Sequence, residues 1–297
     1  MSSTNSVTTI DSKRPNTKQE LIAANIKLLI EQLEAGHSEA LTNYLTAMSR
    51  FHNYSFGNVL EIARQMPTAT RVAGFWTWKN LGRSVKAGQK GIRILAPIVG
   101  VRRKKDEEAE KDITKQNTRV LLGFRNAYVF DVSQTDGVDL PEMREISGDP
   151  GENLERLAAF VRSRGIQLMY SDDLHGALGA SYGGRIAILN GQSKAETFAT
   201  LVHETAHELL HRAERRTATT KTVRETEAES VAFVVGKAVG LVTGSASADY
   251  IQLYHGNASL LAESLEVIQQ TASVILAALE PTISDVVATD ELAEVAA

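Results

Sequence analysis

The chain has 297 residues, of which 43% are hydrophobic and 23% charged, a composition that excludes a disordered or fibrous protein. It has no cysteine, which excludes disulfides and thiolate metal sites and fits a reducing, cytoplasmic location. The net charge of −4 divides unevenly, because residues 1–135 carry 20 basic and 12 acidic side chains and residues 136–297 carry 12 basic and 24 acidic ones. Halves of opposite charge indicate two domains with different partners, and a basic half favours nucleic acid.

The start of the chain lacks a basic region followed by an apolar core, and no stretch approaches the ~18 apolar residues of a membrane span. We therefore expect neither a signal peptide nor a membrane partner. Residues 1–17 are polar and are expected to be disordered. Apolar residues then recur at helical spacing over 18–35, 38–49 and 56–66, and the last of these helices is closed by Pro67.

Strand patterns follow the third helix. They lie at 71–74, 92–101 and 119–132, with a turn or short helix at 75–82 and a glycine-rich basic loop at 83–91. Pro97 places the second of these strands at a sheet edge or a bulge. The charged stretch 102–117 is typical of a solvated loop. These patterns predict an α+β domain over residues 18–134.

The same domain interleaves aromatic and basic side chains. Residues 50–105 contain 12 basic residues and one acid, Glu61. Such surfaces bind single-stranded nucleic acid by stacking bases on rings and pairing phosphates with cations. The alternative is that the rings form the core and the charges a solvated face. The candidate DNA contacts are Tyr54, Phe56, Arg71, Trp76, Trp78, Lys79, Arg83, Lys86, Lys90 and Arg93.

Prolines and glycines within residues 135–151 predict a linker, after which a second domain covers 152–280 and a loose acidic tail covers 281–297. The expected elements of this domain are a helix at 152–164, a strand at 166–170, a hairpin of 180–182 and 185–189, and later helical stretches at 246–256 and 257–279. The strand 185–189 is placed to align an extended peptide as an edge strand.

The chain is organised around His203-Glu204-Thr205-Ala206-His207, which lies in a stretch free of proline and glycine from 192 to 235. Residues four apart lie on one face of a helix, so both imidazoles can bind one zinc ion. Glu204 then lies beside the ion, where its carboxylate can accept a proton from the attacking water. The alternative is a pair of surface histidines on a helix.

A third ligand is expected from the next helix, in which Glu225 and Glu229 share a face. We assign Glu225 as the ligand and Glu229 as the carboxylate that orients a ligand histidine, with the reverse assignment as the alternative. Glu227 is expected to point elsewhere. His211 lies ~12 Å beyond His203 along the helix, too far to share the ion, and is expected to act as a cation at the helix C-terminus. A short sheet followed by these two helices predicts a minimal zincin of the gluzincin type.

Two sets of motifs resemble those of a known family. Tyr54–Leu60, Thr70–Trp78 and Leu81–Ile92 are similar to the N-terminal single-stranded-DNA-binding domain of ArdC-type antirestriction proteins, a likeness that adds Asn58 to the candidate contacts. Phe198–His211 and Arg224–Ala232 resemble the metallopeptidase-like domain of the same proteins, which is related to ImmA/IrrE peptidases. The resemblance implies a protein of plasmids or other mobile elements that shields entering DNA from restriction.

Two functions of different class remain open. The first is a peptidase with one Zn²⁺ per chain, brought to single-stranded DNA by its first domain, with a protein substrate or a restriction enzyme as partner. The second is a non-enzymatic DNA-coating protein with a structural or vestigial metal site. Glu204 favours the first function, because a structural site needs no general base.

Overall fold

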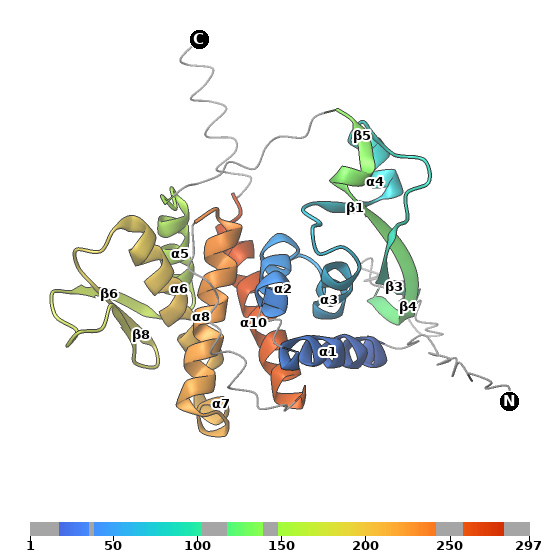
Figure 1. Ribbon diagram of the computed structural model, residues 1–297. Coiled ribbons are helices and arrows are strands. Elements are labelled where there is room, and N and C mark those ends of the chain that lie inside the picture. Colours follow the sequence, from blue (N-terminus) through green and yellow to red (C-terminus); the bar gives the residue numbers. More distant parts are fainter. Residues whose placement is uncertain (1–17, 36–38, 103–117, 139–147, 242–257, 282–297) are drawn as a thin grey trace, which may run out of the picture.

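A computed structural model of the chain describes residues 18–35, 39–102, 118–138, 148–241 and 258–281. The expected disordered start, the solvated loop after residue 102, the helical stretch at 246–256 and most of the acidic tail lie outside the described residues. Figure 1 shows a helical centre with one small sheet region at either end.

The first half opens with three helices whose apolar spacing had predicted them. They are α1 (Lys18–Glu34), α2 (Glu39–Arg50) and α3 (Phe56–Gln65). Leu21, Leu29 and Leu33 of α1 are buried at the spacing expected for one helix face. Asn58 of α3 donates from Nδ2 to the backbone oxygen of Leu95 and accepts the Leu95 N–H, both at 2.9 Å, so it attaches this helix to the following sheet.

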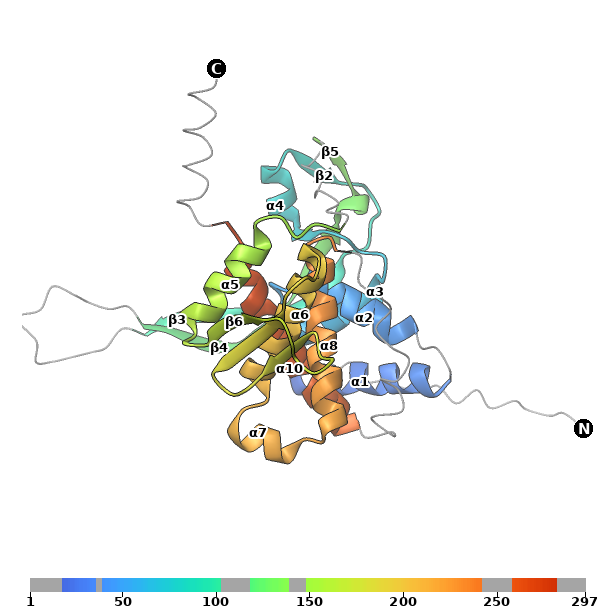
Figure 2. The same cartoon turned by 90° about the vertical axis from the view of Figure 1, so that its left-hand side faces the viewer.

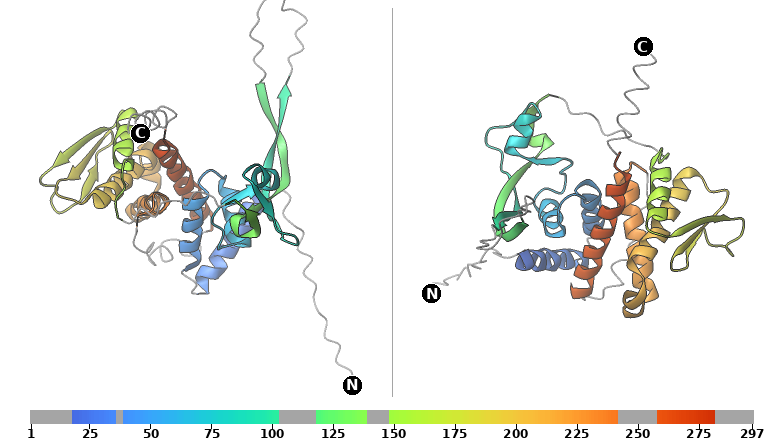
Figure 3. Two further views of the ribbon diagram at one scale, coloured as in Figure 1. Left: turned by 90° about the horizontal axis from the view of Figure 1, so that it is seen from above. Right: turned by 180° about the vertical axis from the view of Figure 1, so that it is seen from behind.

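The sheet of the first half is antiparallel. Its order is β1-β4-β3, with β1 (Val72–Gly74), β3 (Ile92–Arg102) and β4 (Thr118–Asp131), while α4 (Phe75–Asn80) follows β1 and β2 (Arg83–Val85) pairs with β5 (Thr135–Gly137) after the short 3-10 helix η1 (Val132–Gln134). β3 is an edge strand and its register with β4 shifts between Ile98 and Val99, beside Pro97, as that proline predicted. β3 and β4 project from the body as a ribbon (Figure 3).

The second half places a sheet over the helix that carries the histidine motif. α5 (Asn153–Ser163) leads into β6 (Gln167–Ser171), β7 (Gly179–Ser181) and β8 (Arg185–Leu189), and then come α6 (Lys194–Leu210), α7 (Ala213–Ala218), α8 (Lys221–Ala238) and α10 (Ala258–Leu279). The strand order is β6-β8-β7, parallel between β6 and β8 and antiparallel between β8 and β7. Figure 2 shows this sheet in front of α6.

Two expectations for these segments need correction. The strand at 185–189 is β8, which lies between β6 and β7 and pairs with both, so it cannot align a peptide. The edge strands of this sheet are β6 and β7, and β7 is the one that lines the cleft with the histidine motif. Residues 135–137, which were assigned to the linker, form β5 and pair with β2 in the first half. The short helix α7 was not predicted.

α10 packs against both halves of the chain. It contacts α5 and α8 on one hand and α1 and α3 on the other, and α2 packs directly on α8 (Figure 1). Gln269 donates from Nε2 to the backbone oxygen of Tyr54 at 2.9 Å, and Ser273 donates from Oγ to that of His52 at 2.7 Å. One continuous apolar core therefore joins the two halves.

Among the described residues, α10 is the one helix long and apolar enough to cross a membrane, with 22 residues and a mean hydropathy of 1.2. Its Leu261, Leu265, Ile268 and Ile275 are almost fully buried against neighbouring helices. A helix at the centre of a core has this composition because it is covered on several sides.

Candidate metal centre

The helix α6 begins at a capping box that fixes where its later residues point. Ser193 accepts the Glu196 N–H at 3.3 Å, and the Glu196 carboxylate accepts the Ser193 N–H at 2.9 Å. Phe198, Leu201 and the residues in register with them are fully buried, so this face of α6 lies in the core. The metal-binding face, with His203 and His207, is thereby directed to a cleft.

The three predicted ligands lie together. The Nε2 atoms of His203 and His207 are 3.1 Å apart, and Glu225 Oε2 lies 3.5 Å from each of them. Bonds of ~2.0–2.1 Å to a tetrahedral ion put its ligand atoms ~3.3 Å apart, so the three separations fit a zinc-sized ion. The donors form the His/carboxylate group that the sequence predicted, and Glu225 rather than Glu229 completes it.

Glu204 lies in the same cleft, which has a volume of about 290 Å³. Burial, reinforced by the charges of Glu225 and Glu208, raises the pKa of Glu204 to about 7. A β-carbon at Gly179 of β7 would lie 2.9 Å from Glu204 Cγ, so only glycine allows this approach of strand and carboxylate. A carboxyl group with this pKa can exchange a proton near neutrality.

A chain of hydrogen bonds that was not predicted from the sequence begins at Nδ1 of His207, the ring nitrogen that does not face the other ligands. This nitrogen lies 2.9 Å from Nδ1 of His211, and Nε2 of His211 lies 2.9 Å from Oε2 of Glu227. The chain is satisfied when His207 Nδ1–H donates to His211 and His211 Nε2–H donates to Glu227, which leaves the His207 Nε2 lone pair for the ion. The i+4 spacing of His207 and His211 was the available signal.

Glu227 is fully buried, and its negative charge is compensated by hydrogen-bond donors and by a cation. Oε1 accepts from Ser264 Oγ of α10 at 2.6 Å and from Arg215 Nη2 of α7 at 2.7 Å. Burial raises the pKa of Glu227, but the hydrogen bonds from His211 and Ser264 and the charge of Arg215 outweigh burial and lower it. The expectation that His211 is a simple helix-end cation is therefore wrong. Glu227 lies on a different face of α8 from Glu225, as expected, but it supports the site through His211, a role that was not predicted.

Glu229 has a different environment from the one predicted. It is exposed. Its negative charge raises the pKa of His203, and this opposes the larger effect of burial, which lowers that pKa. Burial lowers the pKa of His203, and burial together with the neighbouring His203 lowers the pKa of His207 to about 4. Both imidazoles are thus neutral at pH 7, the form that binds a metal.

The edge strand beside the cleft is attached to α6 by Glu208. This buried carboxylate accepts from Ser181 Oγ at 2.9 Å and from the N–H groups of Gly183 and Gly184, each at 2.7 Å. Arg212 pairs with the same carboxylate. β7 is therefore fixed relative to His203 and His207.

Several candidate DNA contacts lie in the core. Phe56 and Trp78 are buried, and Trp78 donates from Nε1 to the backbone oxygen of Phe130 at 2.8 Å. Asn58 is buried between α3 and β3, and Tyr54 is half-buried with its hydroxyl donating to Val72 at 3.3 Å. Phe56, Asn58 and Trp78 therefore cannot contact DNA in this structure, which corrects those assignments.

Other candidates are engaged within the protein. Arg83 donates from Nε to Thr135 Oγ1 at 2.8 Å, Lys86 lies 3.4 Å from Asp136, and Arg93 lies 3.5 Å from buried Glu61. The half-buried Arg71 donates its backbone N–H to Asp131, and Lys90 is exposed.

One aromatic candidate is open to solvent. Trp76 is 70% exposed, with Lys79 Nζ 5.3 Å from its ring centroid, and it lies beside the half-exposed Phe75. The pair Trp76 and Trp78 diverges because both lie on the helix α4, two residues apart.

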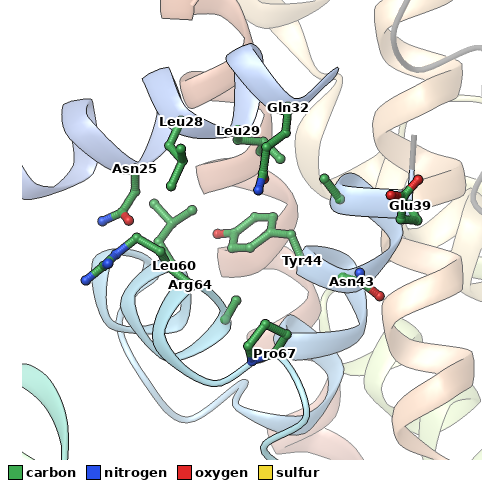
Figure 4. A pocket seen from close by; sticks show the side chains of 12 residues that line it. Asn25, Leu28, Leu29, Gln32, Glu39, Asn43, Tyr44, Leu60, Arg64 and Pro67 are labelled. Atoms are coloured by element: carbon green, nitrogen blue, oxygen red, sulfur yellow. The ribbon is translucent and has the colours of Figure 1, made fainter. Parts of the chain in front are cut away.

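A second cavity, of about 350 Å³, lies between α1, α2 and α3 (Figure 4). Tyr44 lines it, and its buried hydroxyl has no hydrogen-bond partner among the described residues. Burial, together with the charge of Glu266, raises the pKa of Tyr44. The cavity holds none of the metal-binding residues.

Comparison with known proteins gives matches to both sequence and fold. Residues 19–130 match the family model for the N-terminal domain of anti-restriction factor ArdC. The chain is 26% identical over 278 residues to an uncharacterized protein of Bacillus anthracis, a match that covers 80% of this chain and 47% of the other. The chain thus spans about half the length of this curated relative.

The fold is similar to that of the antirestriction ArdC protein of the R388 plasmid. Its metal-free crystal structure matches with a TM-score of 0.53 and 18% identity, covering 87% of this chain and 97% of that one. Its Mn(II)-bound crystal structure matches with a TM-score of 0.45 and 16% identity, over 80% and 97% of the two chains.

Proposed function

We propose, from the premise that residues 19–130 form an ArdC-type N-terminal domain, that this chain is an antirestriction protein that also hydrolyses protein. The first half would bind single-stranded DNA, and the cleft of the second half would cleave a peptide bond. The observation that carries the enzymatic part is the position of Glu204, a buried carboxyl group that lines the same cleft as three converging metal donors.

The donor set of two imidazoles and a carboxylate suits zinc among the divalent ions, and we propose one Zn²⁺ on His203, His207 and Glu225. When bound, the ion supplies Lewis-acid chemistry, which lowers the pKa of water and polarises a carbonyl. Glu204 accepts the proton of the attacking water and passes it to the leaving amine. His211 and Glu227 hold His207 in the tautomer that keeps Nε2 free.

The edge strand β7 supports the choice of a peptide as substrate. Gly179, Ala180 and Ser181 line the cleft together with Glu204. On its other side β7 pairs with β8, so the cleft side offers backbone groups to an extended peptide. DNA binding is supported by a different surface, where Trp76 offers a ring for base stacking next to Lys79.

The test is Glu204→Gln. This variant should keep the metal, measured by mass spectrometry, and lose cleavage of casein or of a restriction subunit by roughly 100-fold or more. Glu229→Gln is the matched control, because this exposed carboxylate lies on the same helix as Glu225 without ligating. A wild-type protein that binds single-stranded DNA but cleaves no protein, with or without that DNA, would support the DNA-coating function instead.

A further inference from the structure

Three basic side chains line the metal cleft. Arg216 of α7 and Lys221 and Arg224 of α8 line it together with the metal-binding residues. Arg216 and Lys221 are exposed, and within the described part of the chain neither is held by an ion pair. Long basic side chains at a cleft mouth are available to a ligand.

Neighbouring cations on the same segment have structural partners instead. Arg212 pairs with Glu208, and Arg215 lies 2.7 Å from Glu227 and 2.5 Å from Glu263. Arg212 and Arg215 therefore hold the fold, whereas Arg216 and Lys221 do not.

Arg224 connects the two groups. Its Nη1 donates to the backbone oxygen of Arg216 at 2.9 Å and to that of Thr219, so it fixes the turn between α7 and α8. Arg216 lies in the last turn of α7, before this connection, and Lys221 is the first residue of α8, after it. The hydrogen bonds of Arg224 therefore fix the backbone from which Arg216 and Lys221 reach the cleft.

The local charge opposes that of the surrounding half. Residues 136–297 hold 24 acidic and 12 basic side chains, yet the cleft lining has three cations against Glu204 and Glu225. A divalent ion on Glu225 and the two histidines adds further positive charge. A cleft whose net charge is positive concentrates acidic substrates.

We propose that Arg216 and Lys221 are specificity residues that select peptides with Asp or Glu next to the scissile bond. The inference rests on the peptidase function proposed above. A peptide is favoured over nucleic acid at this cleft because the edge strand β7 forms part of its lining, and a strand edge binds a peptide backbone and not a phosphodiester chain.

The experiment measures binding rather than turnover. Zinc-loaded Glu204→Gln protein is titrated against three short fluorescent peptides that are identical except for Glu, Gln or Lys at the flanking positions, and anisotropy is recorded. The Glu peptide should bind about 10-fold tighter than the Gln peptide, and the Lys peptide most weakly. Adding Arg216→Glu and Lys221→Glu should reverse the order, and Arg216→Gln with Lys221→Gln should abolish it.

Lys194→Glu is the matched control, because Lys194 is exposed at the start of α6 and does not line the cleft. It should leave the order of the peptides unchanged. Equal binding of the three peptides, an unchanged order in the charge-reversed protein, or displacement of the Glu peptide by a single-stranded oligonucleotide would overturn the inference. Absence of cleavage by the wild-type chain, with the binding order intact, would refute the peptidase function alone.

Discussion

Replacing Glu227 by Gln tests the hydrogen-bond chain behind His207. The carboxylate accepts from His211 Nε2 at 2.9 Å, Ser264 Oγ at 2.6 Å and Arg215 Nη2 at 2.7 Å, and it is fully buried. An amide of the same shape offers one acceptor and one donor group. If its NH₂ group faces His211, Nε2 of His211 must accept that hydrogen bond, so the His211 proton moves to Nδ1. Two N–H donors, Nδ1–H of His211 and Nδ1–H of His207, then point at each other.

His207 must then either lose this hydrogen bond or move its own proton to Nε2, the atom that should bind the metal. Mutation of a carboxylate or histidine that hydrogen-bonds to a metal ligand typically weakens metal affinity ~10- to 100-fold, which corresponds to ~1.4–2.7 kcal/mol. We expect Glu227→Gln to weaken zinc binding by this amount. The Glu225 carboxylate is untouched, so binding should weaken rather than vanish.

Zinc affinity is measured by competition with a chromophoric chelator at pH 7. Glu229→Gln is the first control, since this exposed side chain was the sequence-based choice for the same role. Ser264→Ala is the second, because it removes a bond to Oε1 of Glu227 and leaves the His211 bond to Oε2 intact. It should lower stability by ~1 kcal/mol without changing zinc affinity. The reasoning fails if Glu229→Gln weakens zinc binding more than Glu227→Gln does.

Three further predictions concern the first half. Trp76→Ala in the full chain should weaken binding of a labelled single-stranded oligonucleotide ~5- to 150-fold, measured by anisotropy, and binding should fall steeply with added salt. Trp78→Ala should instead lower the free energy of unfolding by ~3–5 kcal/mol, and the assignment of Trp76 is wrong if the two variants behave alike. Glu61 is buried, which raises its pKa, but hydrogen bonds from Arg64 and Asn25 and the charges of Arg64 and Arg93 lower it overall. Its stabilising contribution is therefore present above pH ~4.5 and lost as the pH falls through the lowered folded value; urea unfolding across this range should show a shallower acid-induced loss for Glu61→Gln, and an unchanged slope would contradict this. Tyr44→Phe removes a buried hydroxyl that lacks a partner, so the unfolding free energy should stay constant or rise by up to ~1 kcal/mol, whereas a clear decrease would reveal a bound partner.

The ligand set could be predicted because helix geometry is local. His203 and His207 are four residues apart, and no tertiary contact is needed to put them on one face. The role of Glu227 could not be predicted in this way, since it depends on α7 turning the chain so that α8 lies against α6. Glu225 and Glu227 lie two residues apart and face opposite environments, one the cleft and the other the core.

The pattern of aromatic and basic residues was less informative. It did not distinguish Trp76 from Trp78, because composition says nothing about which side of α4 meets the sheet. Phe56 and Asn58 belong to a motif that supports the fold through core packing and through the bonds to Leu95.

The position of α10 has a consequence for synthesis on the ribosome. α1 and α3 emerge first, yet part of their apolar surface is covered by a helix that begins at residue 258. Until that helix has left the exit tunnel, the nascent first half exposes this surface and is open to aggregation or chaperone capture. Closing contacts this distant along the chain also slows folding. A fragment that stops near residue 135 should therefore behave as an arrested nascent chain, with more exposed apolar surface than the same residues have in the complete protein.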